Sequence, residues 1–216
     1  MATSTQFAGT GGVSTTEPPS ADNTWRDAGN ITADDGTATA TQGDTFDALR
    51  STNSPTFFLV ASNFGHTLTG ATSIDGIEVK LDIQTAGSNV EDYIIKVSGN
   101  SVGLSDNRAD LAEWVAGTVE TYGSSTDKWF ATDPGWSVSE IEATDFTVYI
   151  SATGTNDLNF LSTNIDYVET VIHYSTAGGG GGAGTNAKIR FGGQDIQNVY
   201  MGDQIITDVY FGSNVT

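Results

Sequence analysis

Short runs of alternating apolar and polar residues fill the middle of the chain and predict β-strands. Residues 76–84 alternate aliphatic side chains with charged or amide side chains, as expected of a strand with one buried face. Clusters of Gly, Asn, Asp and Ser separate this run from similar ones, so we expect an all-β sandwich or barrel from Trp25 to about Tyr174. Further strands are expected at residues 37–42, 55–62, 92–99, 145–153 and 165–175.

One short helix is compatible with the pattern, at residues 137–144. Ser137 or Ser139 can cap its start, and Glu140 and Glu142 suit its first turn. We expect a single helical turn beside a strand.

The chain divides into four segments by composition. Residues 1–22 are rich in Thr, Ser, Gly and Ala without periodicity, which predicts an extended arm that is disordered or ordered only against a neighbour. Residues 23–176 carry the strand pattern. Residues 177–186 contain an unbroken glycine run, which predicts a flexible linker. Residues 187–216 form a separate C-terminal β-repeat.

The C-terminal segment repeats a short phrase at intervals of ten residues. Ile189, Val199 and Val209 occupy equivalent positions, and in each copy a glycine followed by a small or polar residue comes soon after. This spacing suits two-residue turns between strands of about eight residues. We therefore expect a β-meander or one stack of a β-prism.

The expected strands of this repeat carry apolar residues on both faces. About 30 residues cannot cover two apolar faces by themselves, and so small a meander is marginally stable in water. The segment therefore needs a surface to pack on, which is provided by further copies of the chain, by another protein or by its own sandwich. The linker and the repeat favour assembly with other chains over folding back onto the sandwich. The residues expected to oligomerise or dock are Ile189, Phe191, Val199, Tyr200, Met201, Ile206, Val209, Tyr210 and Phe211.

The chain is strongly acidic and contains no cysteine. Its net charge is −19, from 27 acidic and 8 basic residues, so it lacks the basic surface that nucleic acids and anionic membranes require. The charge predicts a well-solvated surface, or else adaptation to saline surroundings, where salt screens the repulsion. Without cysteine there are no disulfides or cysteine-based zinc sites. We identify no secretory signal and no apolar run of about 20 residues that would span a membrane.

No catalytic or cofactor-binding arrangement is visible. His66 and His173 lack metal-ligand spacing, and His173, within an expected strand, is interpreted as structural. Neither a Gly-x-Ser-x-Gly motif nor a phosphate-binding glycine pattern occurs. Acidic loops at residues 34–35 and at Asp106 and Asp110 offer carboxylates to calcium, but neither matches the twelve-residue calcium loop, so no metal site is assigned.

Three tryptophans follow one another closely, at Trp114, Trp129 and Trp136. An exposed row of rings would stack on sugars, which makes Trp114 and Trp129 candidate glycan contacts. The alternative is that these large rings fill the open end of a sandwich.

The middle of the chain carries, in this order, Asn63-Phe64-Gly65, Gly76-Ile77, Trp129 and Asp166-Tyr167. This order of short motifs resembles the jelly-roll module of structural proteins in tailed phages and archaeal tailed viruses, and together with the C-terminal phrases the resemblance covers roughly Trp25 to Gly212. The phrases "VYMG" and "VYFG" resemble Val-Tyr-x-Gly repeats at the ends of phage tail and appendage proteins. The resemblance implies a jelly-roll sandwich and no catalytic residues. The matching positions are Asn63, Phe64, Gly65, Ile74, Gly76, Ile77, Val79, Trp129, Trp136, Phe146, Asp166 and Tyr167.

The resemblance also implies a non-enzymatic structural protein exposed on the virion surface. We expect an oligomeric appendage of the tail-fibre or surface-fibre type. By analogy it is a homotrimer, assembled with other capsid or tail proteins and in contact with host glycans. Two alternatives stay open: a capsid decoration or cement protein on the viral head, and a carbohydrate-binding module or glycan-active enzyme. No cofactor, nucleic acid or membrane partner is expected.

Overall fold

The structure is a computed structural model of the chain, and it describes most of the first 176 residues. It divides into two compact units, Met1–Thr176 and Ala177–Thr216, which are treated separately below. Among the described residues, no helix combines the length and the apolar character needed to cross a membrane. The described residues are 1–14, 24–41, 55–86, 90–133, 135–154 and 163–176, together with the backbone of 189–191, 194–196, 200–201 and 204–205.

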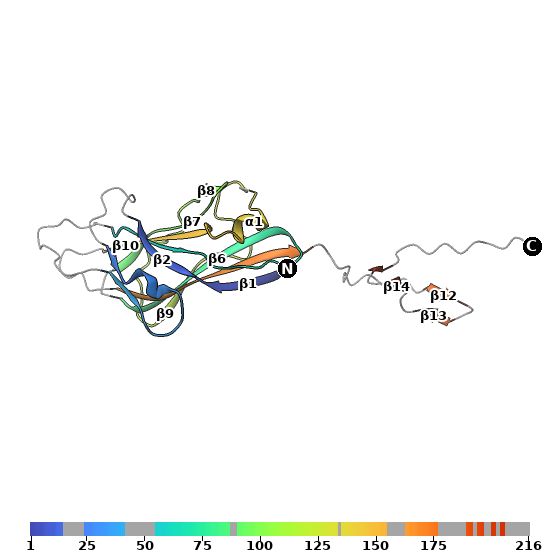
Figure 1. Ribbon diagram of the computed structural model, residues 1–216, viewed down its shortest axis with the longest axis horizontal. Coiled ribbons are helices and arrows are strands. Elements are labelled where there is room, and N and C mark those ends of the chain that lie inside the picture. Colours follow the sequence, from blue (N-terminus) through green and yellow to red (C-terminus); the bar gives the residue numbers. More distant parts are fainter. Residues whose placement is uncertain are drawn as a thin grey trace, which may run out of the picture. The chain divides into compact units, whose positions relative to one another are not determined.

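The first unit is a sandwich of two antiparallel sheets (Figure 1), which confirms the expected all-β class. One sheet has the order β3 (Trp25–Arg26), β4 (Thr39–Thr41), β11 (Asn164–Thr176), β6 (Ala71–Thr85) and β9 (Thr118–Ser124), and β1 (Ala2–Phe7) also pairs with β11. The other has the order β2 (Thr10–Ser14), β5 (Phe58–Ser62), β10 (Thr147–Gly154), β7 (Val90–Gly99) and β8 (Gly103–Leu104).

The core lies between the sheets, and on strand β6 it uses one face. On β6, Ile77, Val79, Leu81 and Ile83 are fully buried, and Val148 on β10 contributes from the other sheet. The polar residues that alternate with them on β6 are partly exposed. Burial of each large aliphatic side chain contributes about 1.5–3 kcal/mol, so this alternation determines which face of the strand points inward.

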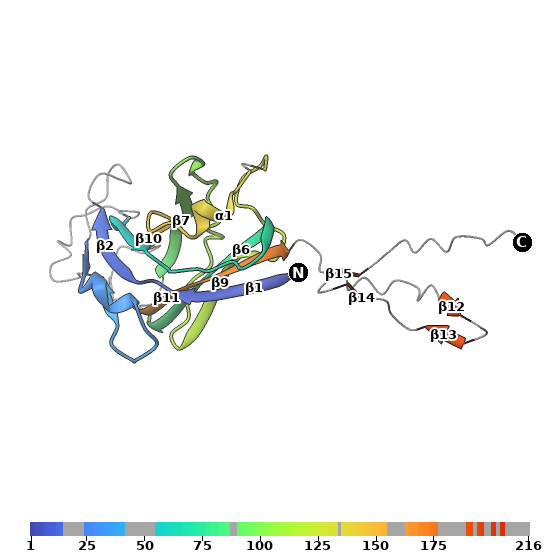
Figure 2. The ribbon, with the colours of Figure 1, turned by 45° about the vertical axis from the view of Figure 1, so that its right-hand side comes forward.

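Residues 2–14 belong to the sandwich, which corrects the prediction of an N-terminal arm that is disordered or ordered only against a neighbour. Strand β1 pairs with the last strand of the unit, β11, with Ala2 opposite Tyr174, and Figure 2 shows the two running side by side. Strand β2 pairs with β5 in the other sheet, with Thr10 opposite Ser62. Both strands are mostly exposed or half-buried, and main-chain pairing at a sheet edge requires no apolar side chains. Residues 15–22 lie outside the described residues.

Helix α1 (Val138–Ile141) begins where the sequence predicts. The Ser137 hydroxyl accepts a hydrogen bond from the Glu140 N–H (3.2 Å), and the Ser137 N–H donates to Glu140 Oε2 (3.1 Å). These two bonds form a capping box, which satisfies two main-chain donors at the start of the helix. The structure adds a short 3₁₀ helix that the sequence did not indicate, η1 (Ala28–Ile31).

The second unit contains two hairpins with the expected spacing. In β12 (Ile189–Phe191) and β13 (Gln194–Ile196), Phe191 pairs with Gln194; in β14 (Tyr200–Met201) and β15 (Gln204–Ile205), Met201 pairs with Gln204. The innermost pairs are therefore ten residues apart, as the repeat predicts. The described strands are shorter than the expected length of about eight residues, and they pair as two separate two-stranded sheets. The third copy and the linker at 177–186 lie outside the described residues.

Candidate functional site

The residues expected to oligomerise or dock fall in the second unit, where the structure describes the backbone of some of them. Ile189 lies opposite Ile196, and Tyr200 lies opposite Ile205. Their role in docking stays a prediction. Ile189, Phe191, Tyr200 and Met201 lie in the hairpin strands, while Val199, Ile206, Val209, Tyr210 and Phe211 lie outside the described residues.

The three tryptophans are core residues, which is the alternative that the sequence left open. Trp114 and Trp136 are almost fully buried, and Trp129 is 0% exposed. Each indole N–H has an internal partner: Trp114 donates to Tyr122 Oη (3.2 Å), Trp129 to the Ile77 carbonyl (2.8 Å), and Trp136 to a main-chain carbonyl. The prediction of glycan contacts at Trp114 and Trp129 is corrected accordingly, because neither ring presents a face on which a sugar can stack.

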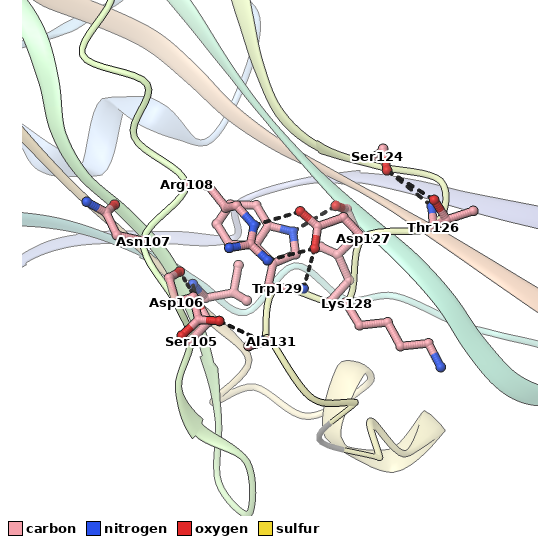
Figure 3. Close-up of polar contacts among 12 residues, drawn as sticks. Ser105, Asp106, Asn107, Arg108, Ser124, Thr126, Asp127, Lys128, Trp129 and Ala131 are labelled. Atoms are coloured by element: carbon pink, nitrogen blue, oxygen red, sulfur yellow. Dashed lines mark hydrogen bonds and ion pairs between the residues drawn. The ribbon is translucent and has the colours of Figure 1, made fainter.

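Trp129 is held in place by a network of polar contacts around Asp127 (Figure 3). Its backbone has φ 64°, in the left-handed region, and its N–H donates to Asp127 Oδ1 (2.7 Å). The Arg108 guanidinium lies 5.9 Å from the centre of the Trp129 ring and forms an ion pair with Asp127. The hydrogen bond from Arg108, followed by smaller effects, holds the Asp127 pKa below its usual range. This network is structural, since it fixes a core ring.

Both histidines have structural partners. His66 is buried, with Nδ1 3.0 Å from Ser4 Oγ on β1 and Nε2 2.7 Å from Thr170 Oγ1 on β11. Burial lowers the His66 pKa from 6.5 to about 4. His173 Nε2 lies 2.9 Å from Glu78 Oε1 on the neighbouring strand, which agrees with its interpretation as structural.

The two acidic loops considered from the sequence do not act as units. Asp106 Oδ2 accepts the Ala131 N–H and so links two segments that lie 25 residues apart in the chain. Asp35 Oδ1 accepts the Thr37 N–H and stabilises a local turn. Asp110 similarly accepts the Ala112 N–H. Asp34 behaves differently and meets two carboxylates from distant strands.

A β-bulge in β11 brings the carboxylates of Asp82 and Asp166 close together. In the pairing of β11 with β6, Ile165 lies opposite Ile83 and Val168 lies opposite Leu81. Two residues of β11 therefore face the one intervening residue of β6, which is the arrangement of a bulge. The residues in question are Asp166 and Tyr167 on β11 and Asp82 on β6.

The loop after η1 completes the cluster. Thr32 forms a bridge with Tyr167, and the Gly36 N–H donates to Asp166 Oδ2 (3.1 Å). These contacts lay the loop over the bulge and bring Asp34 to it. One carboxylate oxygen from each of Asp34, Asp82 and Asp166 lies within 4.8 Å of the other two. We call these three residues the aspartate triad.

The three aspartates of the triad differ in exposure, and their negative charges repel one another. Asp34 is exposed, Asp82 is half-buried and Asp166 is buried. The pKa of Asp82 is raised, first by burial and then by the charges of Asp166 and Asp34. Burial, followed by the Asp82 charge and then other carboxylates, also raises the pKa of Tyr167.

Sequence reasoning found Asp34 but missed Asp82 and Asp166. Asp82 was assigned to the ordinary polar face of a strand. No sequence signal marks Asp166, because its inward position directly after the buried Ile165 in "NIDYVE" is known only from the structure. Two consecutive inward positions break the alternation of a regular strand and indicate a bulge.

Comparison with known proteins gives little further information. No protein-family model matches the sequence, and no curated protein matches it. Among solved structures, the chain is similar to the endo-1,4-β-D-xylanase 10B of Clostridium thermocellum, in a structure of its CBM22-1–GH10 modules complexed with xylohexaose. The identity is 14% and the TM-score is 0.35, over 71% of this chain and 24% of that chain. The match spans about a quarter of the chain in that structure, and a likeness of this degree says nothing about function.

Proposed function

We propose that the protein is a non-enzymatic structural component that works by assembly. The sandwich is the body, and the C-terminal repeat joins it to further copies or to another protein. The observation that carries this proposal is the hairpin repeat, whose paired positions recur ten residues apart in a separate compact unit. Isolated two-stranded hairpins are marginally stable in water, so such a unit gains stability by packing on a partner.

The proposal extends to an exposed appendage on the surface of a tailed-virus particle, with three copies per assembly. Its support is the resemblance of the sandwich motifs and of the Val-Tyr-x-Gly phrases to phage tail and appendage proteins. An antibody against residues 1–176, applied to purified particles of the virus that encodes this protein, should mark the tails. Labelling of heads would instead assign it as a decoration protein, and particles without label would contradict a role in the virion.

The test of assembly is the mass in solution of the full chain and of a chain ending at Thr176. We expect the full chain to have three times its 22.6 kDa monomer mass. The shortened chain should be a folded monomer with an unchanged β-sheet circular dichroism spectrum. A matched variant, Tyr200→Ser with Tyr210→Ser, keeps the length and should also dissociate. A monomeric full chain would refute the proposal, and an oligomeric shortened chain would assign assembly to the sandwich.

Glycan binding by stacked tryptophans is not part of this proposal. Trp114 and Trp129 are buried, so their replacement by Ala would destabilise the core rather than remove a contact. Sugar binding measured on a glycan array would therefore require a different set of residues.

A further inference from the structure

We propose that the aspartate triad, Asp34, Asp82 and Asp166, binds one calcium ion that fastens the loop after η1 to strands β6 and β11. The inference concerns the sandwich alone and does not depend on how the protein assembles.

The spacing of the three carboxylates suits a single ion. One oxygen from each residue lies within 4.8 Å of the others. Calcium holds its oxygen ligands at about 2.3–2.6 Å, so two ligands of the same ion lie no more than about 5 Å apart. The three oxygens therefore fit around one ion without rearrangement of the strands.

An independent observation comes from the buried member of the triad. Asp166 is 3% exposed, and its Oδ2 accepts the Gly36 N–H. Its other oxygen, Oδ1, is buried and has no hydrogen-bond partner among the residues that the structure describes. A buried carboxylate oxygen without a donor is costly and rare in native proteins. A cation at the triad gives this oxygen the partner that it lacks.

The negative charge of the triad also indicates a bound cation. Within the described part of the chain, the Lys and Arg ion pairs go to other acids: Lys80 to Glu169, Arg108 to Asp127 and Lys128 to Asp133. The triad thus places three carboxylates together without a described basic partner. Like charges this close repel strongly where burial reduces screening by water, and a divalent cation offsets that repulsion.

The ligand chemistry favours calcium over other common cations. All the donors are carboxylate oxygens, whereas zinc prefers nitrogen and sulfur. Magnesium demands a near-ideal octahedron at about 2.0–2.1 Å, while calcium accepts six to eight oxygens in irregular geometry. Asp34 is exposed, so its side of the site is open to the water molecules that complete a calcium shell.

The experiment measures thermal unfolding of the full chain, first stripped with EDTA and then titrated with calcium chloride at constant ionic strength. An ion that binds the folded state alone raises Tm, by roughly 5 °C or more once calcium is about 100-fold above its Kd. Isothermal titration in about 0.15 M NaCl, where diffuse binding to the acidic surface is screened, should give one site per chain. Magnesium at the same concentration should give a smaller rise in Tm.

Asp82→Asn is the informative variant because Asp82 is half-buried and makes no hydrogen bond among the described residues. In EDTA it should be at least as stable as the wild type, since one repelling charge is removed. In calcium it should lose most of the rise in Tm. A structural role alone would give a variant that is less stable under both conditions.

Asp35→Asn is the matched control. It removes one charge from the same loop, and an amide oxygen can still accept the Thr37 N–H. It should keep the full rise in Tm, and Asp34→Asn, at an exposed position, provides a second loss variant that folds. The proposal fails if calcium leaves the wild-type Tm unchanged, or if Asp82→Asn and Asp34→Asn keep the full rise.

Discussion

Arg108 binds Asp127 through two parallel hydrogen bonds, from Nε to Oδ2 at 2.7 Å and from Nη2 to Oδ1 at 2.9 Å. Bidentate pairs of this kind fix an orientation as well as a charge. Asp127 also accepts the Trp129 N–H, so the pair determines where a fully buried ring sits. Its contribution is therefore expected to exceed that of an ordinary surface ion pair.

Asp127→Ala should lower the free energy of unfolding by about 1.5–3 kcal/mol, because it removes charge-assisted bonds to two partners. Since the Asp127 pKa is depressed in the folded protein, this stabilisation is complete above the unfolded-state pKa of about 3.9 and is lost as the pH falls below it. Urea unfolding at pH 7 and pH 3 measures both effects. Lys128→Ala breaks a more exposed pair with Asp133 and should cost less than about 1 kcal/mol; an equal loss for both variants would contradict the assignment.

Asp92→Asn should stabilise the protein above pH 6. Asp92 is 0% exposed, and within the described part of the chain its Oδ1 has no hydrogen-bond partner. Burial, together with the nearby Asp110, raises its pKa to about 6, although backbone hydrogen bonds oppose the shift. A raised pKa means that the folded protein favours the protonated form of Asp92. The resulting stabilisation is therefore complete below the unfolded-state pKa of about 3.9, and it is lost as the pH rises through 6. Removing the charge should therefore add about 1–2 kcal/mol at pH 7.5.

Unfolding of Asp92→Asn measured from pH 4 to 8 tests this, because the gain should shrink steadily below pH 6 and vanish near pH 4. Asp145→Asn, at an exposed position, should give no comparable gain. A gain that is constant across this pH range would mean that Asp92 is ionised throughout and that its burial has no electrostatic cost.

Protonation of His66 should weaken the sandwich in mild acid. Its pKa is lowered to about 4 by burial, so its contribution is present above pH 6.5 and is lost as the pH falls through 4. The free energy of unfolding should fall by on the order of 3 kcal/mol over this pH range because of His66. Protonation of Asp92 acts in the opposite direction, since it stabilises the folded protein as the pH falls from 6 to 4. A titration of the His66 ring followed by NMR should give a midpoint near 4, and a midpoint near 6.5 would contradict its burial between Ser4 and Thr170.

Two neighbouring glycines in β2 test whether the N-terminal strands are part of the fold. A Cβ on Gly11 would lie 1.8 Å from the Ala28 carbonyl oxygen, whereas a Cβ on Gly12 would meet nothing within 4 Å. Gly11→Ala should cost about 2 kcal/mol or more through this clash with the main chain, and Gly12→Ala should be nearly neutral. Thermal unfolding distinguishes them, and equal Tm values for the two variants would indicate that β2 is not packed as described.

The parts of the fold that the sequence predicted are those with side-chain signals. The alternation around Ile77 identified β6, and the spacing of Ser137 and Glu140 identified the start of α1. Strands β1 and β2 escaped prediction because their contribution is main-chain pairing, which leaves little trace in small polar side chains. The tryptophan cluster was visible, but sequence spacing does not distinguish an exposed ring from a core ring such as Trp129.

The aspartate triad shows a second limit of sequence reasoning. Asp34, Asp82 and Asp166 are far apart in the chain, and a regular strand pairing would not place two of them at one point. A single extra residue in β11 changes which positions face inward. Such a shift depends on the pairing of two strands, so it becomes visible only when the register is known.

The pairing of Ala2 with Tyr174 puts the beginning of the sandwich and its last strand at the same end of one antiparallel pair. A pulling force applied through residues 1 and 176 would act along the inter-strand hydrogen bonds, which lie perpendicular to the strands. These bonds would break one after another, as in a zip, instead of resisting together in shear. The sandwich should therefore yield at low mechanical load by peeling β1 from β11, and single-molecule stretching through these two ends would reveal it.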